Sequence, residues 1–520
     1  MRGVDLATGI WLDTLLKIYT IATMTKFSIS RLMHFRLRKG YSVKLLLLVF
    51  ACFSLAGVPL WGQVLDTQGL KSALDGLMDS SLVNGASVAV AFYAPEDSSL
   101  IYGYGAGKEL MPASLQKLYI GIGALETYGP GHRFQTEIGI RGEVRDGVLE
   151  GDLVIKGGGD PTWMEAFYPE GPHRVFEMWA DSLKARDIRR VRGNLVGDIS
   201  LYPTYPYNPS WEAHNLPYGF SPGVGALSFN ANMVRFVLKG SSQAGEKARA
   251  YPRHGYNYFE LDNQITTVAE KGSAGIWLQV SEDNSRVTLK GKLGVDTPEY
   301  LTAAVRNPPL FTLRMLRNTL SEKGLSISGK TVLEEDPAIH DSLETLFVFD
   351  SFPLSDILGV MLKTSSNMIA ENLLCNIGAG VENGAVRVEE LLAAKGIPGE
   401  GFNVIDGSGL ARQNSCSASH LGLTLSHAYH QDWFDIFLNS LALPGEDGTL
   451  RSRFTELKGK GRLYGKTGYL RDVSNLAGYL RAQDGELYAF VIICNNVSNV
   501  ANAKKWQASV CDTLLRYSGD

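Results

Sequence analysis

The sequence predicts an α/β (α+β) protein in which a helix-rich domain is split by a large β-rich insertion. Of its 520 residues, 45% are hydrophobic and 20% are charged, which is typical of folded soluble proteins. The 56 glycines favour strands joined by many turns over a helical bundle. Helical patterns near both ends flank a middle region of strand patterns, which indicates one domain interrupted by another.

The net charge of −4 predicts no basic surface for nucleic acid. Residues 1–56 are interpreted as a signal peptide, because the basic stretch Arg31–Lys44 is followed by the apolar run Leu45–Gly57. Small residues allow cleavage after Ala56, or as late as Gly62. An uncleaved anchor or peripheral membrane association remains an alternative. The mature chain would keep 42 basic and 52 acidic residues, a net charge of −10, and is predicted to be exported to the periplasm.

The split domain is expected to comprise residues 64–133 and 343–520. Its first part shows a helix, an alternating strand and a second helix, at 70–82, 86–94 and 112–127. Its second part shows four helices, two strands and a last helix, at 354–362, 367–377, 388–395, 420–429, 475–481, 487–495 and 501–517. Residues 134–342 are predicted to form the insertion, with two subdomains of strands and a single helix at 174–185.

Ser114 and Lys117 form the only SxxK pattern in the chain, at the start of a predicted helix. Residues three apart share one helical face, so the lysine could take the proton of the serine hydroxyl if burial or a nearby positive charge lowers its pKa. The helix N-terminus would add a dipole that favours developing negative charge. The ordinary alternative is a pair on the helix surface.

Two further short motifs follow in the second part. Ser365 and Asn367 precede a helix and could supply a proton relay and an amide for a substrate carbonyl, although helix capping is the favoured interpretation of this motif taken alone. Lys466-Thr467-Gly468 lies in a predicted edge strand, where a lysine, a hydroxyl and a glycine suit the binding of a carboxylate. A plain turn is the alternative for this motif.

In this order, the three motifs are typical of serine enzymes that act on penicillin-like substrates. The chain resembles the penicillin-binding proteins of the D-alanyl-D-alanine carboxypeptidase/endopeptidase type, the low-molecular-weight class C group (peptidase family S13). The DGSGLAR segment 406–412, the LPGEDGTL segment 443–450 and the segment 218–230 resemble the family as well. The 248 residues from Lys117 to Ser365 match its two inserted domains and exceed the gap in β-lactamases.

The resemblance implies a penicillin-binding transpeptidase/β-lactamase-like catalytic domain. It implies no cofactor and no metal, and three histidines on one predicted helix, His420, His427 and His430, are not expected to bind one. Tyr469 follows the KTG motif where many relatives carry Ser or Thr. The implied catalytic residues are Ser114, Lys117 and Ser365, and the implied substrate-binding residues are Asn367, Lys466, Thr467, Gly468 and Tyr469.

The implied activity is that of a serine-type D-Ala-D-Ala carboxypeptidase, with D,D-endopeptidase activity as a further option. Its expected partners are peptidoglycan stem peptides and β-lactam inhibitors. A β-lactamase or esterase on the same fold and a low-turnover peptidoglycan-binding protein remain alternatives. Some relatives recognise diaminopimelate through an acidic side chain near Trp211, where this chain has Glu212 and Asn215. Four cysteines remain after the signal peptide, none in a CxxC motif, and their disulfide state stays open.

Overall fold

The computed structural model describes residues 64–336 and 343–519. The predicted signal peptide, residues 1–56, lies outside the described residues. Within the described ranges, no helix is both long enough and apolar enough to cross a membrane.

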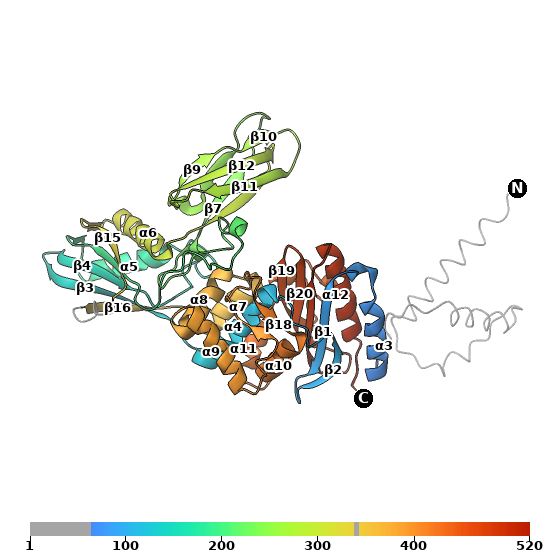
Figure 1. Cartoon of the computed structure of the whole chain (residues 1–520). Helices are drawn as coiled ribbons and strands as arrows, with labels where there is room; N and C mark the ends of the chain where they lie inside the picture. The colour runs from blue at the N-terminus through green and yellow to red at the C-terminus, as the bar shows by residue number, and fades with distance from the viewer. Residues whose placement is uncertain (1–63, 337–342, 520) are drawn as a thin grey trace, which may run out of the picture. The chain divides into compact units, whose positions relative to one another are not determined.

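A five-stranded antiparallel sheet joins the two ends of the described chain (Figure 1). Along β1, Val90 and Phe92 face a core that contains helix α3, while Ala89 and Ala91 face the core around helix α10. The sheet is therefore covered on both faces, which explains the nearly continuous apolar sequence of β1. The strands, in sheet order, are β19 (Leu463–Leu470), β20 (Val473–Arg481), β21 (Leu487–Asn495), β1 (Ser87–Ala94) and β2 (Ser99–Tyr104).

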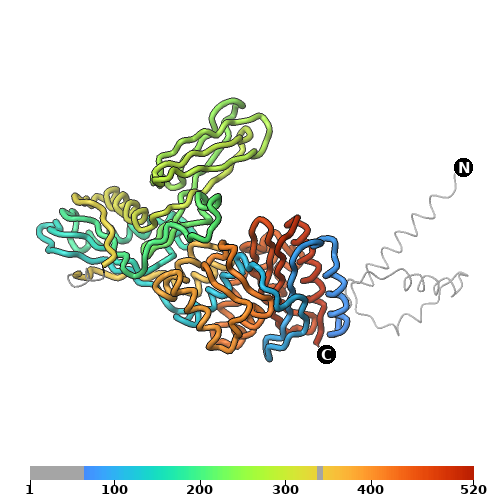
Figure 2. The backbone as a smooth tube through the Cα atoms, in the orientation of Figure 1, coloured from blue at the N-terminus to red at the C-terminus, as the bar shows by residue number. Residues whose placement is uncertain are grey.

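Two helices from opposite ends of the chain lie together on one face of this sheet, as the blue and red segments of Figure 2 show. They are α3 (Thr67–Met78) and α12 (Val500–Leu514), and Trp506 of α12 donates its indole N–H to the carbonyl of Leu77 at 2.8 Å. Further helices of the same domain gather on the opposite side: α4 (Gln116–Tyr128), α7 (Leu354–Thr364), α8 (Asn367–Gly378), α9 (Val381–Ala394), α10 (Ala418–Tyr429) and α11 (Phe434–Ser440).

Helix α4 lies at the centre of this helical layer and is buried from Gln116 to Leu125. Its sequence is apolar on nearly all sides, as expected for a helix surrounded by protein. Gly121 and Gly123 bring neighbouring helices close, because a Cβ at these positions would lie 3.3 Å from Leu358 and 3.2 Å from Val388. The helix that begins at the SxxK motif is thus fixed along its length.

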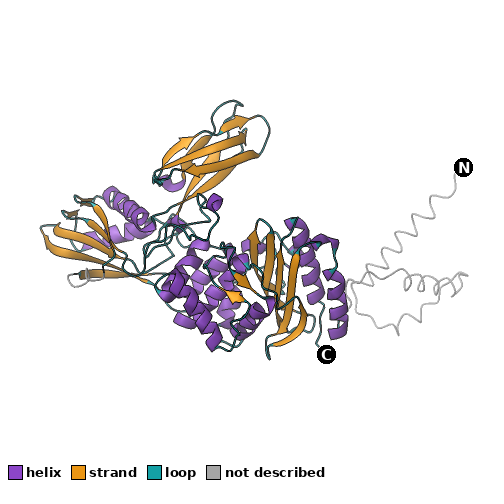
Figure 3. Cartoon of the chain, in the orientation of Figure 1, coloured by secondary structure: helices purple, strands orange, loops and turns teal. Residues whose placement is uncertain are grey.

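Two groups of strands, drawn in orange in Figure 3, lie between α4 and α7 in the sequence. The first is a seven-stranded sheet of β3 (Gln135–Arg145), β4 (Val148–Lys156), β5 (Arg190–Val191), β6 (Leu195–Asp198), β14 (Ser326–Ile327), β15 (Thr331–Glu334) and β16 (Glu344–Asp350). Helix α5 (Arg174–Ala185) contributes to the same core. Strand β16 pairs with β3, so residues 344–350, expected in the split domain, join this sheet.

The second group consists of a three-stranded and a four-stranded sheet. The three-stranded sheet has the order β13 (Pro298–Ala304), β7 (Met233–Lys239), β8 (Arg249–Pro252). The four-stranded sheet contains β9 (Glu260–Asn263), β10 (Thr266–Val268), β11 (Ser273–Val280) and β12 (Arg286–Gly294).

The sequence predictions for three helices need correction, and the first is α11 (Phe434–Ser440), which was not expected. The expectation of a single helix within 134–342 is wrong, because α6 spans Pro308–Glu322. Its two leading prolines resemble a turn, yet proline fits the first helical turn, and Asn307 caps it by accepting from the Leu310 N–H at 3.0 Å. Helix α9 begins seven residues before the expected start at 388, because Gly384 continues the helix and packs against the Leu374 carbonyl of α8.

The four cysteines in the described part of the chain, Cys375, Cys416, Cys494 and Cys511, are all buried free thiols. Burial raises the pKa of Cys416, Cys494 and Cys511 to about 12. These side chains therefore act as small core residues, with no disulfide among them.

Candidate active site

Ser114 lies in a tightly packed turn that opens helix α4. It belongs to the 3-10 segment η3 (Ala113–Leu115), and Ala113 before it has a left-handed φ of 47°. Two glycines make room for this turn: a Cβ at Gly409 would lie 1.9 Å from the Ala113 carbonyl oxygen, and one at Gly468 2.6 Å from that of Pro112. The turn holds the partly exposed Ser114 hydroxyl between a loop on one side and strand β19 on the other.

Lys117 lies directly behind this serine and has no solvent exposure. Its Nζ donates to Ser114 Oγ at 3.0 Å, to Asn367 Oδ1 at 2.7 Å and to the carbonyl of Ser408. Burial lowers the pKa of Lys117 to about 7, against the opposing effect of the nearby carboxyl groups of Asp406 and Glu371. A lysine in this state is neutral often enough near pH 7 to accept a proton from the serine.

Ser365 and Asn367 lie at the junction of helices α7 and α8. Ser365 ends α7 in a left-handed conformation with φ 59°, and Ser366 caps α8 by accepting from the Ile369 N–H at 3.4 Å. Capping therefore falls to Ser366, which leaves the side chains of Ser365 and Asn367 for other contacts. Asn367 accepts from Lys117 and donates through Nδ2 to the Phe220 carbonyl of the inserted region at 2.6 Å.

Lys466, Thr467 and Gly468 lie in β19, at the edge of the five-stranded sheet, as the sequence predicts. Lys466 is wholly buried, and its Nζ donates to Ser365 Oγ at 2.8 Å and to the Thr467 carbonyl at 2.7 Å. Burial, together with the charge of Lys117, lowers the pKa of Lys466 well below its usual value. Thr467 is partly exposed and Tyr469 is 60% exposed.

The glycine of this motif has a role that the sequence did not indicate. Gly468 was expected to let a ligand approach the backbone closely. In the structure it lets β19 approach the turn that carries Ser114. Asn475 on the neighbouring strand β20 fastens the same contact, since its Nδ2 donates to the carbonyls of Met111 and Pro112 at 2.9 Å each. The two motifs are thus held together by backbone packing.

The loop between the short strands β17 (Phe402–Asn403) and β18 (Ser415–Cys416) contributes site residues to which sequence reasoning assigned no role. The Ser408 carbonyl accepts from Lys117, and the Ser408 N–H donates to Glu371 Oε1 of α8 at 2.8 Å. Asp406 accepts from the backbone N–H groups of Gly409 and Ala411, both at 2.7 Å. The DGSGLAR segment was a signal for this loop, and Glu371 was visible as a lone acid in an apolar helix one turn after Asn367.

Glu371 is almost entirely buried, and burial together with the charge of Asp406 raises its pKa. Trp211 of the inserted region donates to Asp406 Oδ2 at 2.7 Å, so the inserted region also supports this loop. Glu212, one of the two candidates for diaminopimelate recognition, pairs with Arg412 Nε at 3.2 Å and accepts from Asn215 Nδ2 at 3.3 Å. Both candidates therefore lie beside the DGSGLAR loop.

The three histidines of α10 have ordinary partners. His420 lies 3.1 Å from the Tyr119 hydroxyl, His430 lies 2.9 Å from the Pro95 carbonyl, and His427 lies 2.9 Å from Glu126. Across residues 64–336 and 343–519, no three His, Cys, Asp or Glu side chains are grouped so that they could hold a metal ion.

A serine hydroxyl on a buried lysine of lowered pKa, flanked by a second serine–lysine pair, is suited to acyl transfer through a serine ester. Residues 70–515 match the D-Ala-D-Ala carboxypeptidase 3 (S13) family. The chain belongs to this family. The resemblance inferred from the motifs is confirmed, and the S13 protein is a serine-type D-Ala-D-Ala carboxypeptidase, a hydrolase that acts on the cell wall outside the cytoplasm.

Individual relatives agree with this assignment. The chain is 29% identical over 474 residues to a D-alanyl-D-alanine carboxypeptidase of Actinomadura sp. (strain R39), which covers 86% of this chain and 85% of the relative. Crystal structures of penicillin binding protein 4 (dacB) from Haemophilus influenzae, alone and complexed with a β-lactam, match with TM-scores of 0.74 and 0.68. Both are 23% identical and cover 85% of this chain and 99% of the other. The predicted fold class is thereby confirmed.

Proposed function

We propose that this S13 carboxypeptidase works through an ester on Ser114, with Lys117 as the general base. The observation that supports this most directly is the 3.0 Å contact between Lys117 Nζ and Ser114 Oγ, made by a lysine whose pKa burial lowers to about 7. As Ser114 Oγ forms a bond to the carbonyl carbon of the D-Ala-D-Ala amide, its proton passes to Lys117.

The second serine–lysine pair serves the leaving group. The C–N bond breaks as Ser365 passes a proton to the leaving amine and takes one from Lys466, which is 2.8 Å away. Asn367 orients the substrate peptide beside Lys117. Water then hydrolyses the ester and restores the serine, and one net proton returns from Lys117 to Lys466 before the next cycle.

The terminal carboxylate of the substrate binds at β19, with Lys466 supplying charge and Thr467 a directional hydroxyl. An arriving carboxylate favours the protonated form of Lys466, opposing the burial and the neighbouring Lys117 that lower its pKa. The backbone N–H groups of Ser114 and Tyr469 form the oxyanion hole, in which one donor is typically worth about 3 kcal/mol. The close packing at Gly468 supports this assignment, because it brings β19 up to the serine turn.

The proposal extends to the surroundings of the enzyme. Residues 1–56 direct export to the periplasm. Residues 64–133 and 343–520 form the catalytic domain, except for strand β16 (Glu344–Asp350), which completes the inserted sheet, and residues 134–342 form an insertion of two subdomains. Peptidoglycan stem peptides are the substrates and β-lactams are inhibitors, for which the β-lactam complex of the Haemophilus influenzae protein is support. Cleavage of D,D cross-links is a second activity of the same site, favoured by the open space beyond Ser365.

Mass spectrometry of the intact protein after incubation with benzylpenicillin tests the proposal, combined with an assay for D-alanine release from a pentapeptide. We expect one persistent adduct, mapped to the peptide that contains Ser114, together with release of D-alanine. Ser114→Ala removes one oxygen without opening a large cavity, so it should fold normally and take up no label. Rapid turnover of the adduct would indicate a β-lactamase, and no adduct would indicate a peptidoglycan-binding protein. If Ser114→Ala were still labelled normally by benzylpenicillin, Ser114 would not be the nucleophile.

A further inference from the structure

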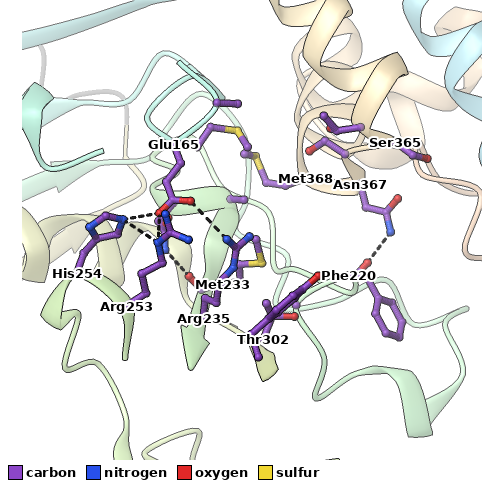
Figure 4. Close-up of a pocket in the computed structure, with 18 residues that line it drawn as sticks. Glu165, Phe220, Met233, Arg235, Arg253, His254, Thr302, Ser365, Asn367 and Met368 are labelled. Atoms are coloured by element: carbon purple, nitrogen blue, oxygen red, sulfur yellow. Dashed lines mark hydrogen bonds and ion pairs between the residues drawn. The ribbon is translucent and has the colours of Figure 1, made fainter. Parts of the chain in front are cut away.

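A pocket of about 680 Å³ extends from the active-site serine–asparagine motif into the inserted region (Figure 4). Ser365 and Asn367 line one side of it. The other side carries a charged cluster of Glu165, Arg235 and Arg253, which come from separate parts of the insertion. The pocket is therefore continuous with the place where the proposed mechanism puts the leaving amine.

The charged cluster carries more positive than negative charge. Its single carboxylate, Glu165, pairs with Arg253 Nε at 2.7 Å and Arg235 at 3.5 Å, and it also contacts His254. Two guanidinium groups thus share one carboxylate, and guanidinium groups stay charged at neutral pH. The buried Nε–H of Arg235 has no acceptor among the described residues. The partly exposed guanidinium groups of Arg235 and Arg253 are suited to a further anion, above all a carboxylate.

The cluster is also held in position before any ligand arrives. Arg235 extends from strand β7, and its guanidinium lies 5.4 Å from the centre of the Tyr300 ring on β13. Arg253 follows strand β8, which pairs with β7, and its neighbour His254 adopts a left-handed φ of 55°. Arginines fixed on paired strands lose little conformational entropy on binding, so this side of the pocket is preorganised.

The leaving group of a carboxypeptidase reaction, a single D-alanine, would leave most of this space empty. The leaving group of a D,D cross-link is larger: its D-centre presents the amine to Ser365 and the carboxylate to β19, and its remaining substituent continues into a whole stem peptide. That substituent departs next to Ser365, where the pocket begins.

We propose that Arg235 and Arg253 form a subsite for a carboxylate of the leaving stem peptide and thereby select cross-linked substrates. This inference rests on the proposed function, since it takes Ser365 as the donor to the leaving amine. Glu165 acts as the internal partner that holds both arginines until the substrate carboxylate arrives. The two arginines are specificity residues and take no part in bond breaking.

The test compares two substrates in the double variant Arg235→Met/Arg253→Met, which keeps long apolar side chains and removes the guanidinium donors. We expect kcat/KM on a cross-linked muropeptide dimer to fall by roughly 10- to 100-fold, as for loss of charge-assisted contacts. D-alanine release from a monomeric pentapeptide and acylation by benzylpenicillin should stay within about twofold of wild type. The matched control is Arg286→Met, which removes an exposed arginine–carboxylate pair with Glu260 elsewhere in the insertion and should alter neither reaction.

A second arm uses the wild-type protein and a dimer in which every carboxylate of the leaving stem, except the one beside the scissile bond, is amidated. For the wild type, kcat/KM should be lower on the amidated dimer than on the natural dimer, by about the same factor as the double variant loses on the natural dimer. For the double variant, amidation of the dimer should lower kcat/KM little further. This arm also covers a double variant that fails to fold. If the double variant lost kcat/KM equally on monomer and dimer, the pocket would bind the part of the substrate that stays on the serine as the ester. If its cleavage of the dimer were unchanged, the two arginines would not bind the leaving stem peptide. Either result overturns the subsite. A wild type that takes up no penicillin overturns the proposed function instead.

Discussion

The lysine pair of the active-site motifs and the arginine pair of the adjoining pocket differ in how far they are removed from water. Lys117 and Lys466 have no solvent exposure, and burial lowers the pKa of both. The side chains of Arg235 and Arg253 are 32% and 45% exposed and share a carboxylate. The comparison shows how one fold assigns two tasks to positive charge. A buried lysine can lose and regain a proton, whereas a partly exposed arginine keeps its charge and can only bind.

The strongest way to break this comparison is to replace Lys117 by a cation that cannot lose its proton. Lys117→Arg should lower acylation by benzylpenicillin by about 10²- to 10⁴-fold, the usual contribution of a general base. In wild type the neutral amine is the active form. The acylation rate should therefore fall by about tenfold per pH unit below pH 7 and level off above it, because the pKa of Lys117 is about 7. Stopped-flow acylation from pH 5 to 9 measures both effects.

The control is Lys363→Met, since Lys363 pairs with Asp447 at 2.7 Å and touches neither motif serine. Its acylation profile should follow that of wild type. If the acylation rate of Lys117→Arg above pH 7 equalled that of wild type, another group would have to take the proton of Ser114.

Site residues can be predicted from the sequence when they lie close together along the chain. Ser114 with Lys117, Ser365 with Asn367, and Lys466 with Thr467 are each within three residues of one another, so each pair forms a short motif, and the three motifs together, in this order, predicted the site. The Ser408 carbonyl that accepts from Lys117 is 291 residues away from it, and a backbone oxygen leaves no trace in a residue pattern.

Burial was the second limit on prediction. The sequence analysis required burial or a nearby positive charge to lower the pKa of Lys117, but only the packing of the structure shows that Lys117 is buried. The same holds for Glu371, whose position in an apolar helix is compatible with a surface charge. The charged pocket is the extreme case. The pairing of β7 and β8 brings Arg235 near Arg253, and Glu165 joins them from a segment 70 residues before Arg235, so no short sequence pattern contains the three.

A smaller effect is expected at the second lysine, where the comparison can be sharpened by choice of substrate. Lys466→Met should lower kcat/KM on a D-Ala-D-Ala peptide by roughly 10- to 150-fold, because a charge-assisted contact to a carboxylate is worth about 1.5–3 kcal/mol. The fall in kcat/KM should be smaller for an acyl substrate whose leaving group carries no carboxylate, because that substrate loses the proton supply to Ser365 but has no clamp contact to lose. Steady-state kinetics on both substrates measure the difference. Equal losses would leave the proton supply to Ser365, which is 2.8 Å away, as the whole contribution of Lys466 and would exclude the carboxylate clamp.

The smallest effect is expected from Glu371, which touches no reacting atom and acts through Ser408. Its carboxyl group raises the pKa of Lys117, opposing burial. Glu371→Gln removes the negative charge of the ionised form, which the raised pKa of Glu371 of about 8 makes a minor form near pH 7, while keeping an acceptor for the Ser408 N–H. With less negative charge nearby, the ammonium form of Lys117 is less favoured, so its proton is lost at lower pH. The midpoint of the acylation profile should therefore move to lower pH, with the plateau rate within a few-fold of wild type.

Glu371→Ala, which also removes the acceptor, separates a positioning role from a purely electrostatic one. It should release the Ser408 backbone and slow acylation at every pH, and the retained plateau of Glu371→Gln would then represent rescue by the conservative variant. Glu177→Gln, at a carboxylate paired with Arg174 and Lys323 in the inserted region, is the control and should leave the profile unchanged. A fall of several orders of magnitude in the plateau of Glu371→Gln would mean that Glu371 itself carries the proton. Base catalysis would then belong to this buried carboxyl group, and the lysine would only hold the serine in place.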